Sequence, residues 1–156
     1  MWDYNSMDCS PHFVLVDDDL DDTSLFEEVL LEVQPTVKFQ AAHNGLDAMN
    51  MLRNAGTELP DLIFLDLNMP RMDGKQCLVA IKEDDLLKNI PVIMYSTSSQ
   101  PKDIEETRQA GAICFITKPT SIHELRNILS AIVNGLNKIE ETVETLSQNE
   151  GMCIIR

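Results

Sequence analysis

Five short, mostly apolar runs, alternating with segments of helical character, constrain the fold of this chain more strongly than any other feature. The runs are predicted as strands and lie at 12–16, 37–42, 61–66, 91–96 and 113–117. Helices are predicted between and after them, over 21–34, 45–56, 75–84 and 101–110 and from Ser121 onward. Strands that are apolar on both faces are typical of a parallel sheet covered by helices on both sides. The sequence therefore predicts an α/β fold with a doubly wound, five-stranded parallel sheet, five helices and right-handed crossovers.

The composition narrows the classes of partner. The 156 residues suffice for one domain with a sizeable core. Asp and Glu number 26 against 12 Lys and Arg, a formal net charge of -14, so direct binding to nucleic acid is not expected. No apolar stretch approaches the roughly 20 residues that span a bilayer, and no leader opens the sequence. A soluble protein with no membrane partner is therefore expected. The four cysteines lack C-x-x-C spacing, so reduced thiols in a cytoplasmic protein are expected as well.

Polar side chains stand at the carboxyl ends of four predicted strands, where doubly wound folds gather their functional residues. They are Asp17 and Asp18 after the first strand, Asp66 at the end of the third, Ser96 and Thr97 at the fourth, and Lys118 after the fifth. Clustered carboxylates raise one another's pKa, so this arrangement is costly unless it is solvated or faces a cation. Mg²⁺ prefers such hard oxygen ligands. Because a carboxylate can form an aspartyl-phosphate, Asp66 is the natural nucleophile for phosphoryl transfer.

Four motifs contain these residues: "VLVDDD", "DLIFLDLNMPRMDG", "PVIMYSTS" and "FITKP". In this order and at these separations they resemble the signatures of the receiver domain of two-component response regulators, over residues 12 to about 135. The resemblance implies a flavodoxin-like receiver fold with strand order 2-1-3-4-5. It also implies that the chain is a phosphorylation-dependent binding module and not an enzyme.

Matched residue by residue, the resemblance assigns roles to the acidic residues. Asp66 is the phosphoacceptor, Asp17 and Asp18 form the acidic pair, and Asp18 is the direct Mg²⁺ ligand. Asn68 is expected to lend its backbone carbonyl to the metal. The implied reaction is Mg²⁺-dependent transfer of a phosphoryl group to Asp66 from a histidine kinase or a histidine phosphotransfer protein.

The resemblance also assigns the residues that respond to the phosphoryl group. Ser96 matches the switch hydroxyl, and Lys118 matches the ion-pairing lysine. Thr97, beside Ser96, is a further candidate for the phosphate-binding and switch residues. Phe115 matches the aromatic ring that changes burial when the hydroxyl moves. Pro119 follows Lys118 through a peptide bond that is typically cis in the family. Repacking of the last predicted strand and the two helices beside it would then present a surface to a downstream protein.

A calcium loop is an alternative interpretation of the same acidic cluster. Asp17, Asp19, Asp21 and Glu28 fall at positions 1, 3, 5 and 12 of the EF-hand pattern. Position 6 needs Gly for a sharp turn and is occupied by Asp22, and the helical period begins inside the supposed loop. In the receiver interpretation, Asp21 and Asp22 only favour the start of a helix.

Two further functional alternatives remain open from the sequence. Phosphatases of the haloacid dehalogenase type use an aspartate nucleophile with a second aspartate two residues later as general acid. Here Asn68 stands at that position, which favours a slow switch over a turnover catalyst. The other alternative is a receiver-like adaptor that is not phosphorylated.

The two ends of the chain extend beyond the resemblance. Residues 1–11 are expected to form a mobile arm, 12–135 the receiver domain and 136–156 a C-terminal helical extension and tail. An apolar stripe with heptad spacing begins in the last receiver helix. It consists of Leu125, Leu129, Ile132, Leu136, Ile139, Val143 and Leu146. Our hypothesis is that this helix continues to about residue 146 and that its second half pairs with another copy of the chain or with a partner. The alternative is a tail folded back on its own domain.

Overall fold

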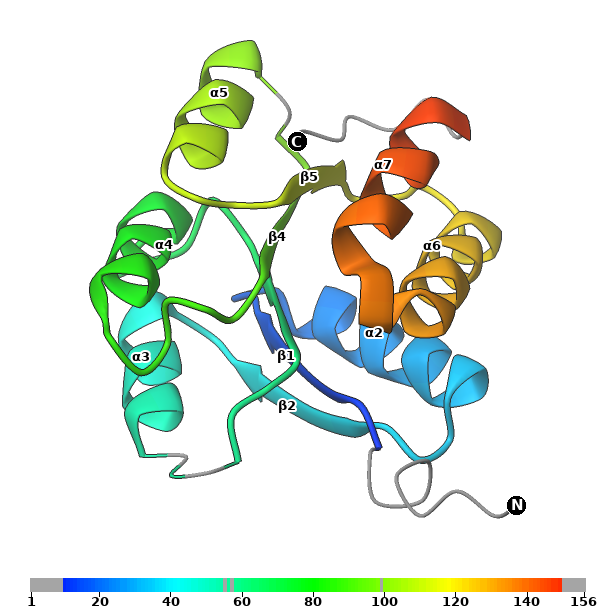
Figure 1. Ribbon diagram of the computed structural model, residues 1–156, viewed down its shortest axis with the longest axis horizontal. Helices are drawn as coiled ribbons and strands as arrows, with labels where there is room; N and C mark the ends of the chain where they lie inside the picture. The colour runs from blue at the N-terminus through cyan, green and yellow to red at the C-terminus, as the bar shows by residue number, and fades with distance from the viewer. Residues whose placement is uncertain (1–9, 55, 57, 99, 150–156) are drawn as a thin grey trace.

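A twisted parallel sheet forms the centre of the molecule in the computed structural model, which describes residues 10–54, 56, 58–98 and 100–149 (Figure 1). The strands are β1 (His12–Val16), β2 (Lys38–Ala42), β3 (Leu62–Leu65), β4 (Val92–Ser96) and β5 (Cys114–Thr117). Their order is β2-β1-β3-β4-β5 and every pairing is parallel. The predicted α/β class, the doubly wound sheet and its strand order are confirmed. The arm expected at 1–11 lies outside the described residues for all but its last two positions.

Helices cover both faces of the sheet. They are α2 (Leu20–Val33), α3 (Gly45–Arg53), α4 (Gly74–Glu83), α5 (Pro101–Gln109), α6 (Ile122–Asn134) and α7 (Ile139–Asn149), with a short 3-10 turn η1 (Leu136–Lys138) before the last. Figure 1 shows α3, α4 and α5 on one side of the sheet and α2, α6 and α7 on the other. The described residues thus contain six α-helices where the sequence predicted five. None of these helices combines the length and apolarity needed to cross a membrane.

The strands supply two separate cores because their side chains alternate between the two faces. Val14 and Val16 of β1 belong to the core beneath α3 and α4, which includes Met49. Phe13 and Leu15 belong to the core beneath α2 and α6. All four of these β1 side chains are fully buried, as expected for a central parallel strand. The doubly covered sheet leaves its carboxyl edge as the place where polar residues can gather.

The C-terminal part of the apolar stripe folds back on its own domain, so the hypothesis of one continuous helix to residue 146 is wrong. Helix α6 ends at Asn134 with Gly135 as its C-cap, and the Thr142 hydroxyl donates to the Gly135 carbonyl over 3.0 Å. A Cβ at Gly135 would lie 2.0 Å from the Thr142 hydroxyl oxygen, so only glycine permits this approach. Gly also lowers helix propensity at the break.

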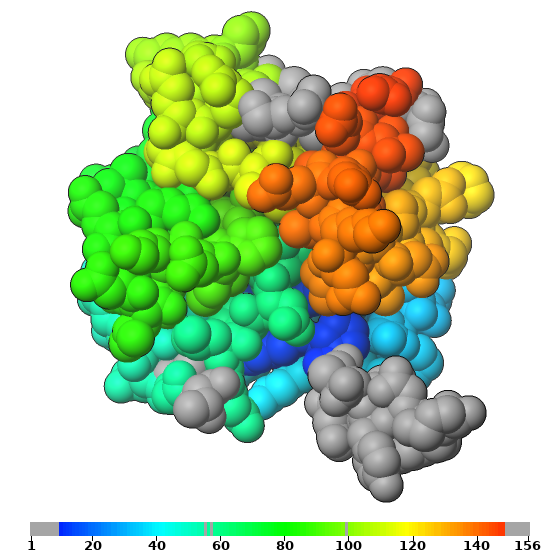
Figure 2. All heavy atoms as spheres, in the orientation of Figure 1, coloured from blue at the N-terminus to red at the C-terminus, as the bar shows by residue number. Residues whose placement is uncertain are grey.

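Helix α7 buries the end of the stripe in the core beneath α2 and α6. Val143 is 2% exposed and Leu146 is 7% exposed. Leu136 and Ile139 are partly buried against the same core. Figure 2 shows α7 (orange) lying against α6 (yellow). The alternative of a folded-back tail is therefore the arrangement observed. The stripe is not free for the homodimer that the continuous helix would have formed.

Candidate functional site

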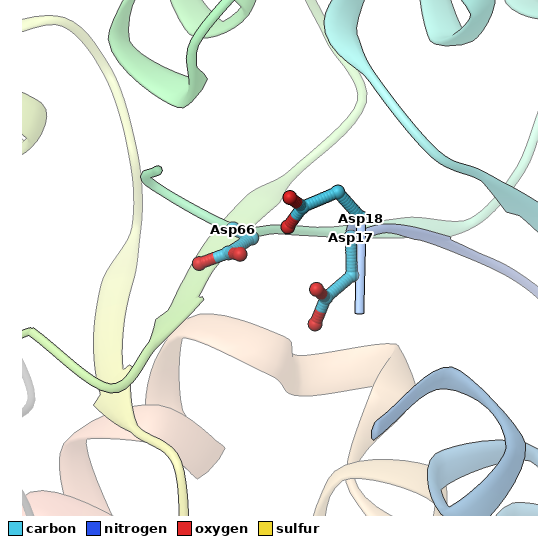
Figure 3. A group of neighbouring side chains, drawn as sticks. All are labelled: Asp17, Asp18 and Asp66. Carbon is cyan, nitrogen blue, oxygen red and sulfur yellow. The ribbon is translucent and has the colours of Figure 1, made fainter. Parts of the chain in front are cut away.

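Parallel strands bring three carboxylates together at the carboxyl edge of the sheet. Asp17 follows β1 and Asp66 follows β3, and the backbone N–H of Asp66 donates to the Val16 carbonyl over 2.8 Å. Asp18 is next along the chain. One carboxylate oxygen each from Asp17, Asp18 and Asp66 lie within 4.8 Å of one another (Figure 3). The structure therefore assembles the three acidic residues that the sequence predicted as metal ligands.

Burial changes the acidity of the candidate nucleophile. Asp17 is fully buried and Asp66 is 6% exposed, whereas Asp18 is open to solvent. The pKa of Asp66 is raised to about 6 because burial disfavours its charged form. The Lys118 ammonium opposes this shift and the Asp17 carboxylate adds to it. Without a bound cation, part of the Asp66 population is therefore protonated near neutral pH.

Lys118 supplies the positive charge of the site, but it lies closer to other carboxylates than to Asp66. Its Nζ is 2.7 Å from Asp17 Oδ2, 2.7 Å from Asp22 Oδ2 and 4.0 Å from Asp66 Oδ2. Burial lowers the pKa of Lys118, but the ion pair with Asp17 and the hydrogen-bonded ion pair with Asp22 outweigh it and raise the pKa above its ordinary value. The side chain is only 9% exposed. The lysine is therefore a buried, fully charged cation in the resting site.

Ser96 reaches the candidate nucleophile from β4. Its side chain is fully buried, and a hydrogen bond from its hydroxyl helps to lower the pKa of Asp66 against the effect of burial. The backbone N–H of Ser98 donates to the Ser96 hydroxyl over 3.3 Å, and the N–H of Lys118 donates to the Ser96 carbonyl over 2.8 Å. Thr97 is exposed beside it. The ends of β3, β4 and β5 thus place a carboxylate, a hydroxyl and an ammonium around one point.

The other predicted residues lie around this centre. Asn68 is exposed in the loop after Asp66, and Phe115 is fully buried in the core beneath α3 and α4. The peptide bond between Lys118 and Pro119 is trans, so the expectation of a cis bond is contradicted. Trans is the more stable isomer of X–Pro bonds by about 0.5–1 kcal/mol.

Two residues of the site were not predicted in their observed roles. Asp22 was expected only to favour the start of α2, yet it forms an ion pair with Lys118. Tyr95 is 5% exposed, and the Lys118 ammonium lies 5.7 Å from the centre of its ring. Helical periodicity carried a signal for Asp22, because Asp22, Phe26 and Val29 share one face of α2 and the latter two are buried.

Comparison with known proteins identifies the family. The sequence model of the response regulator receiver domain matches residues 13–130. The chain belongs to the response regulator receiver family. This receiver is 32% identical over 123 residues to response regulator Rcp1 of a Synechocystis species, covering 76% of this chain and 84% of Rcp1.

Solved receiver structures share the fold. The phosphorylated cyanobacterial phytochrome response regulator RcpA superimposes with a TM-score of 0.76 at 34% identity, covering 83% of this receiver and 96% of RcpA. The Mn²⁺-bound form of Rcp1 superimposes with a TM-score of 0.69 at 31% identity, covering 78% and 91% of the two chains.

The local geometry of the receiver disfavours the calcium loop. Asp19 is the N-cap of α2, and its side chain accepts hydrogen bonds from the backbone N–H groups of Asp21 and Asp22. The helix begins at Leu20, inside the supposed loop. By contrast, Asp17, Asp18 and Asp66 form a compact set of oxygen donors in which one member is exposed. That donor set suits a hard divalent cation that keeps some of its water.

Proposed function

We propose that this receiver accepts a phosphoryl group on Asp66 from the phosphohistidine of a histidine kinase or a histidine phosphotransfer protein, in a Mg²⁺-dependent reaction. The observation that carries the proposal is the arrangement around Asp66. Its carboxylate adjoins the Ser96 hydroxyl, lies 4.0 Å from the Lys118 ammonium and shares a compact acidic cluster with Asp17 and Asp18. Nucleophile, hydrogen-bond donor and cation are the groups that phosphoryl transfer to a carboxylate requires.

The transfer exchanges one bond to phosphorus for another. An Asp66 carboxylate oxygen forms the new O–P bond, while the N–P bond of the phosphohistidine breaks. The electron pair of the broken bond returns to the imidazole nitrogen, which takes up one proton. Lys118 and Ser96, which both lie near the Asp66 carboxylate, would stabilise the oxygens of the phosphoryl group on Asp66. Asp66 must be ionised to act, so a cation that favours its charged form assists the reaction.

Asp17, Asp18 and Asp66 would hold Mg²⁺ together with the backbone carbonyl of Asn68. The bound ion would neutralise charge on the transferring phosphoryl group and reduce repulsion between the carboxylates. The three carboxylate oxygens within 4.8 Å of one another support this assignment. The Mn²⁺-bound form of Rcp1 is consistent with a divalent cation in a related receiver.

Output would pass through the face formed by α5, β5 and α6, by contacts with a downstream protein. Ser96 lies at the end of β4, and Phe115 lies in the neighbouring strand β5. A phosphoryl group that draws the Ser96 hydroxyl toward it would leave space that the Phe115 ring can occupy. Such a local electrostatic event can shift the balance between two arrangements of one surface.

Intact-mass spectrometry after incubation with acetyl phosphate and Mg²⁺ tests the proposal directly. The wild type should gain one phosphoryl group that hydroxylamine removes, because an acyl phosphate is sensitive to that nucleophile. Asp66→Asn should remain unmodified, and wild type with excess EDTA should be modified much more slowly. A wild-type protein that gains no phosphoryl group with either acetyl phosphate or a phosphohistidine donor would favour the adaptor without phosphorylation.

A further inference from the structure

A carboxylate outside the proposed phosphoacceptor site shares the lysine of that site. Asp22 Oδ2 lies 2.7 Å from Lys118 Nζ, the same distance as Asp17 Oδ2, whereas Asp66 Oδ2 is 4.0 Å away. Asp22 belongs to the first turn of α2, which is 96 positions from Lys118 in the sequence. A residue on a different element therefore lies closer to the ammonium than the candidate nucleophile does.

The ion pair with Lys118 is specific to Asp22 and is not shared by the other acidic residue in the first turn of the helix. Asp21 occupies the same turn, but its side chain is exposed and takes part in no salt bridge among the described residues. Asp22 lies on the inward face with Phe26, and its side chain is 38% exposed. A hollow of about 100 Å³ adjoins Asp22, Lys118 and Tyr95. The Asp22–Lys118 pair is thus a specific contact at the edge of the site.

We propose that Asp22 is a positioning residue that holds Lys118 back from Asp66 and lowers the affinity of this receiver for a phosphoryl group. The inference rests on the proposed function of Asp66. A phosphoryl group on Asp66 presents new anionic oxygens to Lys118, and the lysine must leave Asp22 to contact them closely. Because the Asp22 contact exists only in the resting arrangement, it shifts the equilibrium toward that arrangement.

The expected effect is modest because the pair is partly open to solvent. Exposed and partly exposed ion pairs typically change an equilibrium constant by about two- to fivefold. Replacing Asp22 by Asn removes the charge but keeps the shape of the side chain. The variant should therefore bind a phosphoryl mimic about two to five times more tightly than a variant that loses only a neighbouring charge.

Beryllofluoride, which mimics a phosphoryl group on a carboxylate, provides the test. Its dissociation constant is measured by ¹⁹F NMR titration at saturating Mg²⁺ for wild type, Asp22→Asn, Asp21→Asn and Asp22→Glu. Asp21→Asn is the matched control, because it changes the net charge and the first turn of α2 equally but breaks no ion pair. Asp22→Glu keeps a carboxylate that can reach Lys118 and should bind closer to wild type than Asp22→Asn does. Thermal unfolding without ligand verifies that all four proteins are folded.

The outcomes separate this inference from the proposed function. Tighter binding by Asp22→Asn than by Asp21→Asn supports it. Equal binding by these two variants, or weaker binding by Asp22→Asn, would overturn the role of Asp22 while leaving Asp66 as phosphoacceptor. No binding by wild type would overturn the proposed function and this inference with it.

Discussion

Val143 allows the strongest test of how α7 is attached to the receiver. The side chain is 2% exposed and packs in the core that includes Leu129 and Ile132. Val143→Ala removes two methyl groups, and each buried group of this size contributes about 0.8 kcal/mol of transfer free energy. With a further contribution from the cavity left behind, the free energy of unfolding should fall by about 2 kcal/mol. For a domain of this size, that corresponds to a decrease in Tm of about 4–8 °C.

Urea and thermal unfolding followed by circular dichroism measure this effect. Val79→Ala on α4 is the matched control, because the same two methyl groups are removed from a side chain that is 42% exposed. Both variants make the same change in helix propensity, so the difference between them reports burial. The control should change the free energy of unfolding by less than about 0.5 kcal/mol. Equal effects in the two variants would refute the packing of α7 against the receiver core.

Two further predictions concern the acidic cluster. The raised pKa of Asp66, about 6, means that the folded state binds this proton more tightly than the unfolded state does. In EDTA, Asp66→Asn should therefore be more stable than wild type by on the order of 2–3 kcal/mol at pH 8, and the difference should shrink as the pH falls through 6 toward 4. Urea unfolding across this pH range measures it, and a difference independent of pH would contradict the assignment. Mg²⁺ at 100 times its dissociation constant should raise the unfolding free energy of wild type by about 2.7 kcal/mol. Asp18→Asn should lose most of that gain at the same Mg²⁺ concentration. In EDTA its stability should match that of wild type, because Asp18 is exposed. An undiminished gain from Mg²⁺ would show that Asp18 is not a metal ligand.

The sheet and the centre of the site were accessible from sequence because both depend on short, local patterns. A run such as Leu62–Leu65 is apolar on both faces, and the residue after it must lie at the carboxyl edge of a parallel sheet. The positions of Asp17, Asp66 and Lys118 follow from that rule alone. What the rule leaves undetermined is which carboxylate the lysine approaches most closely, because that depends on how α2 is oriented against β5.

The C-terminal segment shows a second limit of sequence patterns. The spacing of Leu129, Ile132 and Val143 correctly indicated an apolar face but not the surface that covers it. A long helix paired with another chain and two helices folded together bury the same residues. The break at Gly135 decides between them, since the Thr142 side chain occupies the space that a Cβ would need.

The burial of Leu146 also bears on where this receiver can be cut and joined. The family pattern ends at residue 130, but the core beneath α2 and α6 takes side chains from as far along the chain as Leu146. A fusion that joins another module directly after α6 would expose the apolar surface that α7 now covers. Engineered sensors that transplant this receiver should therefore retain α7 and place their junction after it.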